Sequence, residues 1–273
     1  MPGLVNSHAH TPMTLVRGAG DGLPLMDWLT KVMWPREGQM TPEDALWGMR
    51  LGAAEMLLAG VTSTCEMYLY EDAIVEAATE IGIRLAITPG IISAVHGTSL
   101  AAVDNRINEI SEFHSQHHDP ESLITVGFGP HSAYDLPLNV CSEIASAAQD
   151  LQALLHIHVC ETETEGATLE AQNGGRSTVQ LLSDHGVFDG RVLAAHSVWL
   201  DNVDIETFAQ KDVRVAHCPV SNMKLASGSA PIASMRSKGI DVGLATDGPA
   251  SNDDLDLWQE IKFAPLLARV SSL

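Results

Sequence analysis

Short apolar runs alternate along the chain with longer stretches whose apolar residues recur at helical spacing. Eight runs predict strands: Leu4–Ser7, Val61–Glu66, Arg84–Ile91, Leu123–Gly129, Leu154–Val159, Val192–Ala195, Val213–Ala216 and Asp241–Ala245. Between them the pattern predicts helices over Thr41–Ala59, Glu71–Ile81, Asn139–Leu151 and Ser177–His185. The first of these helices has a clear start, because Thr41 can cap it and Pro42 suits its first position.

The order of these elements predicts an α/β fold. Continuous apolar strands separated by helices are typical of a parallel sheet, and eight such strands can close into a (β/α)8 TIM-type barrel. The 273 residues fit one barrel domain, 1–273, since such barrels use about 250 residues. An open doubly wound sheet is the alternative, but no GxGxxG follows a predicted strand, which disfavours its dinucleotide-binding form.

The first connection, His10–Gly60, is longer than one helix needs. It carries Trp28, Trp34 and Glu37 in a stretch without periodicity. Two interpretations stay open here. Long loops at the carboxyl end of barrel strands often build or cover a site, whereas a surface insertion would simply pack its tryptophans underneath.

Charge and composition exclude several classes of partner. The chain has 15 Lys+Arg and 35 Asp+Glu, a net charge of -20, so it would repel a nucleic acid. No apolar run approaches the ~20 residues of a membrane span, and no basic segment followed by an apolar one begins the chain, so we expect a cytoplasmic protein. The four cysteines, Cys65, Cys141, Cys160 and Cys218, form no CxxC, which excludes a disulfide scaffold or zinc ribbon.

Side chains able to bind a metal follow most of the predicted strands. They are His8 and His10, His131, His156 and His158, His196, His217, and Asp247. In a strand, residues two apart face the same side, so His8 and His10 can share one ion. Burying so many polar groups unpaired around one axis would cost a few kcal/mol each, on the order of a lost hydrogen bond. A divalent cation at the barrel mouth removes that cost, and imidazoles with one carboxylate suit Zn²⁺ or Fe²⁺.

These segments resemble the amidohydrolase superfamily, and within it the 5-methylthioadenosine/S-adenosylhomocysteine deaminase branch, which is related to the triazine hydrolases. The motifs that carry the resemblance are Pro2–His10, Met33–Glu37, Gly129–Ser132, His158–Thr162, Ala195–Ser197, His217–Asn222 and Thr246–Asn252. They span nearly the whole chain in the family's order. The resemblance implies a metal-dependent hydrolase barrel that deaminates a purine nucleoside, such as adenosine, 5-methylthioadenosine or S-adenosylhomocysteine. In that reaction metal-bound hydroxide attacks the ring carbon and ammonia leaves.

The resemblance also implies a role for each matching residue. One divalent metal ion, Zn²⁺ with Fe²⁺ or Mn²⁺ as alternatives, would be held by His8, His10, His158 and Asp247. The catalytic residues would be Glu161, which shuttles protons, His196, which orients the water, and Asp247, which can take a proton from it. The small, purine-like substrate would contact Trp28, Glu37 at its ribose hydroxyls, and His131 and Ser251 at its ring nitrogens.

Two departures from the family refine this expectation. Members with two metals bridge them by a carboxylated lysine after strand four, where this chain has His131, so we predict one metal. Relatives that accept S-adenosylhomocysteine grip its carboxylate with arginines. Between Leu51 and Gly175 this chain has only Arg84, at the start of a predicted strand, and Arg106. We therefore expect a substrate without a carboxylate tail.

Two other functions stay open. The chain could hydrolyse another heterocycle, such as a triazine or an oxidised guanine. It could also be a metal-binding but inactive fragment, because relatives add a small β-sandwich before and after the barrel and the printed sequence contains neither half. Apolar surface left uncovered in this way would favour instability or association into homo-oligomers.

Overall fold

The strands of the computed structural model, which describes residues 1–271, all run parallel. They form two four-stranded sheets, ordered β1-β2-β3-β5 and β10-β9-β8-β7, and the short pair β4-β6. Their bounds are β1 Leu4–Ala9, β2 Val61–Glu66, β3 Arg84–Ile87, β4 Gly90–Ile91, β5 Ile124–Val126, β6 Gly129–Pro130, β7 Leu154–Val159, β8 Arg191–His196, β9 Arg214–His217 and β10 Val242–Leu244.

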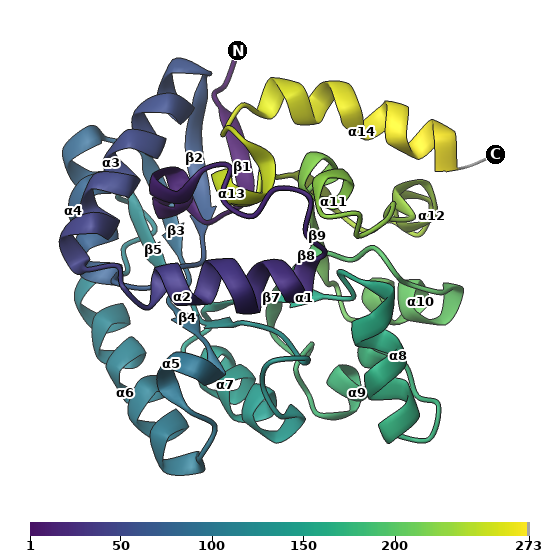
Figure 1. Cartoon of the computed structure of the whole chain (residues 1–273). Helices are drawn as coiled ribbons and strands as arrows, with labels where there is room; N and C mark the ends of the chain where they lie inside the picture. Colours follow the sequence, from purple (N-terminus) through teal and green to yellow (C-terminus); the bar gives the residue numbers. More distant parts are fainter. Residues whose placement is uncertain (272–273) are drawn as a thin grey trace.

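Isolated β-bridges close these sheets into a barrel. Phe128, between β5 and β6, pairs with Leu155 in β7, and Ala9 at the end of β1 pairs with Asp247 just after β10. Since β4 continues β3 and β6 continues β5, the ten strands within residues 1–271 form the eight strand positions of the barrel. Figure 1 shows the strands in the middle and helices around them. The predicted (β/α)8 barrel is confirmed.

The helices also follow the prediction closely. The longer ones are α3 Pro42–Leu58, α4 Glu71–Ile81, α6 Leu100–His117, α7 Leu138–Asp150, α8 Glu163–Gln172, α9 Thr178–Asp184, α10 Asn202–Gln210 and α14 Leu257–Ser271. Shorter ones are α1 Leu25–Trp28, α2 Trp34–Glu37, α5 Ser93–His96, α11 Pro219–Lys224, α12 Ile232–Ser237 and α13 Pro249–Asn252, with a 3₁₀ helix over Thr11–Val16 and a π-helical turn over Leu29–Met33. Thr41 caps α3 in a capping box with Asp44, as its sequence indicates. Within the described residues, every helix is too short or too polar to traverse a lipid bilayer.

Two predicted strands are broken in the structure. The run Arg84–Ile91 divides at Thr88-Pro89, where proline has no N–H to give to the ladder. The run Leu123–Gly129 divides at Gly127-Phe128. A Cβ on Gly127 would lie 2.3 Å from the carbonyl oxygen of Leu154, so only glycine fits beside β7. The predicted lengths of these two strands were therefore wrong, although the strands lie where they were predicted.

The long connection between β1 and α3 covers the carboxyl end of the barrel. Figure 1 shows α1 and α2 crossing the front of the barrel mouth. The π-helical turn that joins them precedes Pro35, which has no N–H for a regular helical hydrogen bond. Leu25, Trp28 and Met33, which belong to this segment, are buried. The interpretation of the connection as a cover is confirmed.

A buried carboxyl joins α14 to the loops after β9 and β10. The Oε1 atom of Glu260 accepts from Asn252 Nδ2 at 2.7 Å, and its Oε2 accepts from the Val220 N–H at 3.2 Å. Burial raises the pKa of Glu260 from 4.5 to about 7, against these hydrogen bonds. The folded state therefore favours the protonated carboxyl, and this stabilisation is present below pH 4.5 and lost as the pH rises through 7.

We expect Glu260→Gln to remove most of this pH dependence. The free energy of unfolding of the unaltered chain should fall by about 3 kcal/mol more than that of the variant between pH 4 and pH 8. Denaturant unfolding at several pH values measures the difference. An equal pH dependence in both proteins would show that this carboxyl does not titrate between those limits.

Candidate active site

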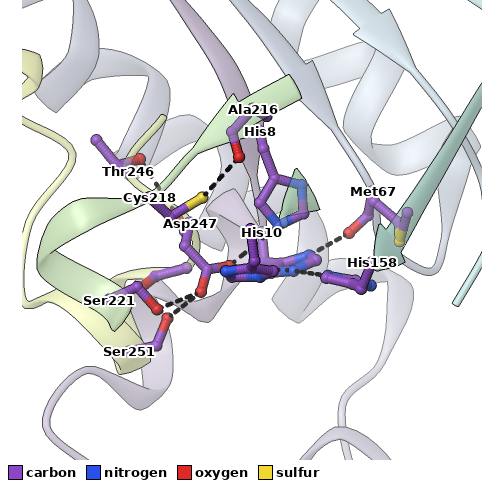
Figure 2. Close-up of polar contacts among 12 residues, drawn as sticks. His8, His10, Met67, His158, Ala216, Cys218, Ser221, Thr246, Asp247 and Ser251 are labelled. Carbon is purple, nitrogen blue, oxygen red and sulfur yellow. Dashed lines mark hydrogen bonds and ion pairs between the residues drawn. The ribbon is translucent and has the colours of Figure 1, made fainter. Parts of the chain in front are cut away.

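Four potential metal ligands converge at the carboxyl end of the barrel (Figure 2). They come from three places: His8 and His10 at the end of β1, His158 in β7, and Asp247 after β10. The Oδ1 atom of Asp247 lies 3.2 Å from His8 Nε2 and 3.3 Å from His10 Nε2. The Nε2 atom of His158 lies 3.3 Å from that of His10. The structure thus brings together all four predicted ligands.

Backbone carbonyls orient two of these imidazoles. The Nδ1 of His10 donates to the Met67 carbonyl at 2.5 Å, and the Nδ1 of His158 donates to the His131 carbonyl at 2.7 Å. With Nδ1 protonated, each Nε2 keeps its lone pair for the centre of the cluster. This is the usual outer hydrogen bond of a metal-binding histidine.

Two hydroxyls orient the carboxylate (Figure 2). Ser221 Oγ donates to Asp247 Oδ2 at 2.6 Å, and Ser251 Oγ donates to the same atom at 2.8 Å. Asp247 has a left-handed backbone with φ 63°, which few residues other than glycine adopt and which is frequent at functional sites. These constraints leave Oδ1 facing His8 and His10.

The ionisation states of this cluster suit a cation. Burial lowers the pKa of His8 to about 3 and that of His158 well below its ordinary value. Burial by itself would raise the pKa of Asp247, but contact with His8 and the nearby His10 and His196 holds it well below its usual range. A buried carboxylate therefore lies beside the uncharged imidazole of His8. The Nε2 of His8 is buried with no hydrogen-bond partner in the described structure. His8, His10 and Asp247 present ligand atoms close enough together to hold a divalent cation, and His158 Nε2 lies beside that of His10.

Glu161 and His196 lie beside the four ligands. Glu161 Oε2 is 3.8 Å from His196 Nε2. Burial raises the pKa of Glu161 well above its ordinary value, and the charge of Asp247 adds to the effect. The ring of His196 is oriented through Nδ1, which donates to Asn222 Oδ1 at 2.9 Å. The pair therefore offers to the same space a carboxyl whose protonated form burial favours and an imidazole nitrogen.

A cavity opens above these groups. Its wall includes the predicted residues Trp28, Glu37 and His131, as well as Glu161 and His196. Burial raises the pKa of Glu37, although the Tyr68 hydroxyl opposes the shift. Burial also lowers the pKa of His131 to about 4, with Asp135 opposing it, so this imidazole is uncharged at neutral pH.

Ser251 has a different place from the one expected of a purine contact. It is buried behind Asp247 and off the cavity wall, and its hydroxyl oxygen also lies 3.0 Å from the carbonyl of Gly248. We propose that Ser251 orients Asp247 rather than contacting the substrate. His217, another strand-end histidine, is likewise buried and off the wall, which suits a packing role.

Sequence reasoning missed the residues that support the site from the next element. Ser221 and Asn222 both lie in α11, just after β9, and each orients one of the groups described above. Tyr134, which lines the cavity, follows β6 in the same way. Their positions after parallel strands were the available signal, because carboxyl ends of parallel strands meet at one mouth.

A parallel barrel with three imidazoles and one carboxylate at its mouth has the architecture of the metal-dependent hydrolases. The amidohydrolase family matches residues 1–272, and the chain belongs to this family.

Named relatives include two nucleoside deaminases. The chain is 40% identical to the 5'-deoxyadenosine deaminase of Methanopyrus kandleri, over 100% of this chain and 62% of the relative. It is 42% identical to the 5-methylthioadenosine/S-adenosylhomocysteine deaminase of Desulforudis audaxviator, over 99% of this chain and 62% of the relative. The chain therefore spans less than two thirds of the length of these relatives.

Solved structures agree with this grouping. A zinc-bound adenosine deaminase from Xanthomonas campestris superposes with a TM-score of 0.92 at 36% identity, covering 100% of this chain and 62% of that one. An atrazine chlorohydrolase from Arthrobacter aurescens, complexed with zinc, superposes with a TM-score of 0.88 at 27% identity, covering 99% and 65%. These likenesses agree with the barrel and with a metal-dependent hydrolase family.

Proposed function

We propose that this protein catalyses the metal-dependent hydrolytic deamination of an adenosine-type nucleoside. The observation that carries the proposal is the buried pair Glu161 and His196, placed beside four converging metal ligands at the floor of the cavity. The names of the relatives, which are deaminases of 5'-deoxyadenosine and 5-methylthioadenosine, support this choice of substrate.

The metal would be held by His8, His10, His158 and Asp247, whose free Nε2 and Oδ1 atoms face one another. Zinc suits these donors, and zinc is the ion bound by the adenosine deaminase of similar structure. Such an ion, when bound, lowers the pKa of a coordinated water to near neutrality.

The protein's own groups move the protons. Burial favours the protonated form of Glu161, and this carboxyl can donate its proton to a ring nitrogen of the purine, which makes the adjacent ring carbon more electrophilic. His196 keeps a lone pair on Nε2, because Nδ1–H is committed to Asn222, and can orient or deprotonate the attacking water. Asp247 can accept a proton at its carboxylate. Addition of water and loss of ammonia complete the reaction.

The cavity wall would hold the nucleoside. Glu37, on the cover of the barrel, would bind the ribose hydroxyls, and Trp28 would pack against the substrate. His131, which is uncharged, would hydrogen-bond a ring nitrogen.

Ammonia release from a panel of purine nucleosides, with the purified chain and added Zn²⁺, tests the proposal. Turnover of adenosine, 5'-deoxyadenosine or 5-methylthioadenosine is the expected result. Turnover of a triazine or an oxidised guanine in their place would support the second kind of hydrolase. Metal binding without any ammonia release would support an inactive scaffold and contradict the proposal.

Glu37→Gln should separate nucleosides from bare bases. We expect kcat/KM for the nucleoside to fall about 10- to 100-fold, since a charged hydrogen bond to the ribose is worth roughly 1.5–3 kcal/mol, while turnover of free adenine stays unchanged. Glu43→Gln, an exposed carboxyl in α3, is the matched control. An equal loss on both substrates would mean that Glu37 does not recognise ribose.

The charge of the substrate's 5' substituent gives a second prediction. The described wall of the cavity includes neither lysine nor arginine. The guanidinium of Arg106 is engaged by Glu71 at 2.8 Å and Glu109 at 3.2 Å, and Arg84 donates to the Ser122 carbonyl at the opposite end of β3. We expect kcat/KM for 5-methylthioadenosine to exceed that for S-adenosylhomocysteine by at least about tenfold. Parallel assays of both substrates measure this, and the reverse preference would refute it.

A further inference from the structure

A buried chain of hydrogen bonds leads away from His8 into the barrel. His8 Nδ1 lies 2.8 Å from His156 Nε2. On the far side of that ring, His156 Nδ1 lies 3.0 Å from the Thr88 hydroxyl, which donates to the Glu66 carbonyl at 3.0 Å. His8, His156 and Thr88 are each 0% exposed, so solvent cannot substitute for any of these partners.

The contacts of Thr88, at the far end of this series of hydrogen bonds, determine which atom is the donor in each of them. Thr88 has a single hydroxyl proton, and with that proton given to the Glu66 carbonyl its oxygen accepts from His156 Nδ1–H; the same Nδ1 also lies 3.5 Å from Cys65 Sγ, which can accept as well. A neutral His156 then has a lone pair on Nε2, which accepts from His8 Nδ1–H. His8 is thereby left with an unprotonated Nε2 facing Asp247 Oδ1 at 3.2 Å.

We propose that His156 is a positioning residue that fixes the tautomer and the ring orientation of His8 for metal binding, with Thr88 as its anchor. His10 and His158 obtain the same constraint from backbone carbonyls. In His8 the constraint comes from side chains, so substitution can remove it without altering a ligand. This inference rests on the proposed metal centre but does not require the deaminase activity.

The alternative is that His156 merely fills space in the core. Pairs of variants that are similar in shape but differ in hydrogen bonding distinguish the two roles. In His156→Gln, the amide Oε1 can accept from His8 Nδ1–H, whereas His156→Leu offers no acceptor. Thr88→Ser keeps the anchoring hydroxyl, whereas Thr88→Val preserves the shape of threonine and lacks the hydroxyl.

The experiment measures metal affinity directly, by competition between each metal-free protein and a chromogenic chelator for Zn²⁺. Absorption of the Co²⁺-loaded proteins reports the geometry of the site. We expect His156→Leu to weaken Zn²⁺ binding about 10- to 100-fold and Thr88→Val about tenfold, with an altered Co²⁺ spectrum in both. His156→Gln and Thr88→Ser should stay within a few-fold of the unaltered chain. His185→Gln, on an exposed histidine directly after α9, controls for loss of a non-specific imidazole.

Unchanged affinity and spectrum in both His156→Leu and Thr88→Val would overturn the proposal. If His156→Leu fails to fold, the Thr88 pair decides, because serine and valine differ in the hydroxyl that the proposal requires. Equal weakening by Thr88→Ser and Thr88→Val would also overturn it. Failure of the unaltered chain to bind Zn²⁺ would remove the metal centre and this inference together. Tight Zn²⁺ binding without deamination would refute the proposed function alone.

Discussion

Replacing Glu161 with glutamine is expected to lower kcat for nucleoside deamination about 10³-fold, the scale of a lost general acid and base. Glutamine has nearly the same shape, but it cannot donate a proton to the purine ring and take one back. Its neighbour His196, 3.8 Å away, presents only Nε2 to this space, and that nitrogen is already assigned to the attacking water, so His196 should not replace the carboxyl. Steady-state kinetics at saturating substrate measure the effect.

This loss should occur without loss of fold or of metal. Glu161 lies outside the proposed ligand set, so Zn²⁺ content and thermal stability of Glu161→Gln should match those of the unaltered chain. Glu163→Gln, an exposed carboxyl two residues further on in α8, is the control and should retain full kcat. A Glu161→Gln variant that keeps most of its kcat would refute the assigned role in proton transfer.

The barrel and the meeting of the ligands were predictable because both follow from short-range pattern. Continuous apolar runs such as Val192–Ala195 indicate parallel strands, and parallel strands in a barrel end at the same mouth. A histidine or aspartate directly after a strand therefore lies near the others, however far apart they are in sequence. His8 and Asp247 are separated by most of the chain, yet Ala9 and Asp247 form a bridge that closes the barrel.

The hydrogen bonds that orient these groups were not predictable in the same way. Ser251 follows Asp247 by four residues, a spacing equally compatible with a hydroxyl facing the substrate or the carboxylate. The structure decides between them, because Ser251 Oγ lies 2.8 Å from Asp247 Oδ2. The contact of His156 with His8 likewise depends on the stagger between two strands on opposite sides of the barrel. Such contacts depend on three-dimensional register rather than on local composition.

The cover of the barrel lies between these two cases. Its tryptophans and Glu37 have no periodic order, so the sequence left open whether they face a site or a core. The structure shows that Trp28 does both, because its ring lines the cavity while its indole N–H donates to the Ala19 carbonyl at 3.0 Å. A residue that closes a cavity is buried by the same contacts that would bury it in a core, which is why burial alone could not distinguish the two.

Removal of the metal is expected to abolish deamination, and one equivalent of Zn²⁺ per chain should restore it. The described structure offers two overlapping ligand groups, His8 with His10 and Asp247, and His8 with His158 and His196. Because both groups contain His8, and His158 Nε2 lies 3.3 Å from His10 Nε2, they describe one centre rather than two. We therefore expect activity lost on chelation to return in proportion to added Zn²⁺ and to level off at one equivalent.

Metal analysis of the active protein, combined with this titration, is the measurement. A bridging lysine for a second ion would lie at the end of β6, the fourth strand position of the barrel. His131 occupies that place. Its carbonyl orients His158, and its Nδ1 lies 3.2 Å from the Ser132 hydroxyl. This position therefore offers no lysine side chain that could bridge a second ion to the first. Two equivalents of metal in fully active protein, or activity that rises beyond the first equivalent, would contradict a single centre. Full activity after exhaustive chelation would contradict the metal-dependent reaction itself.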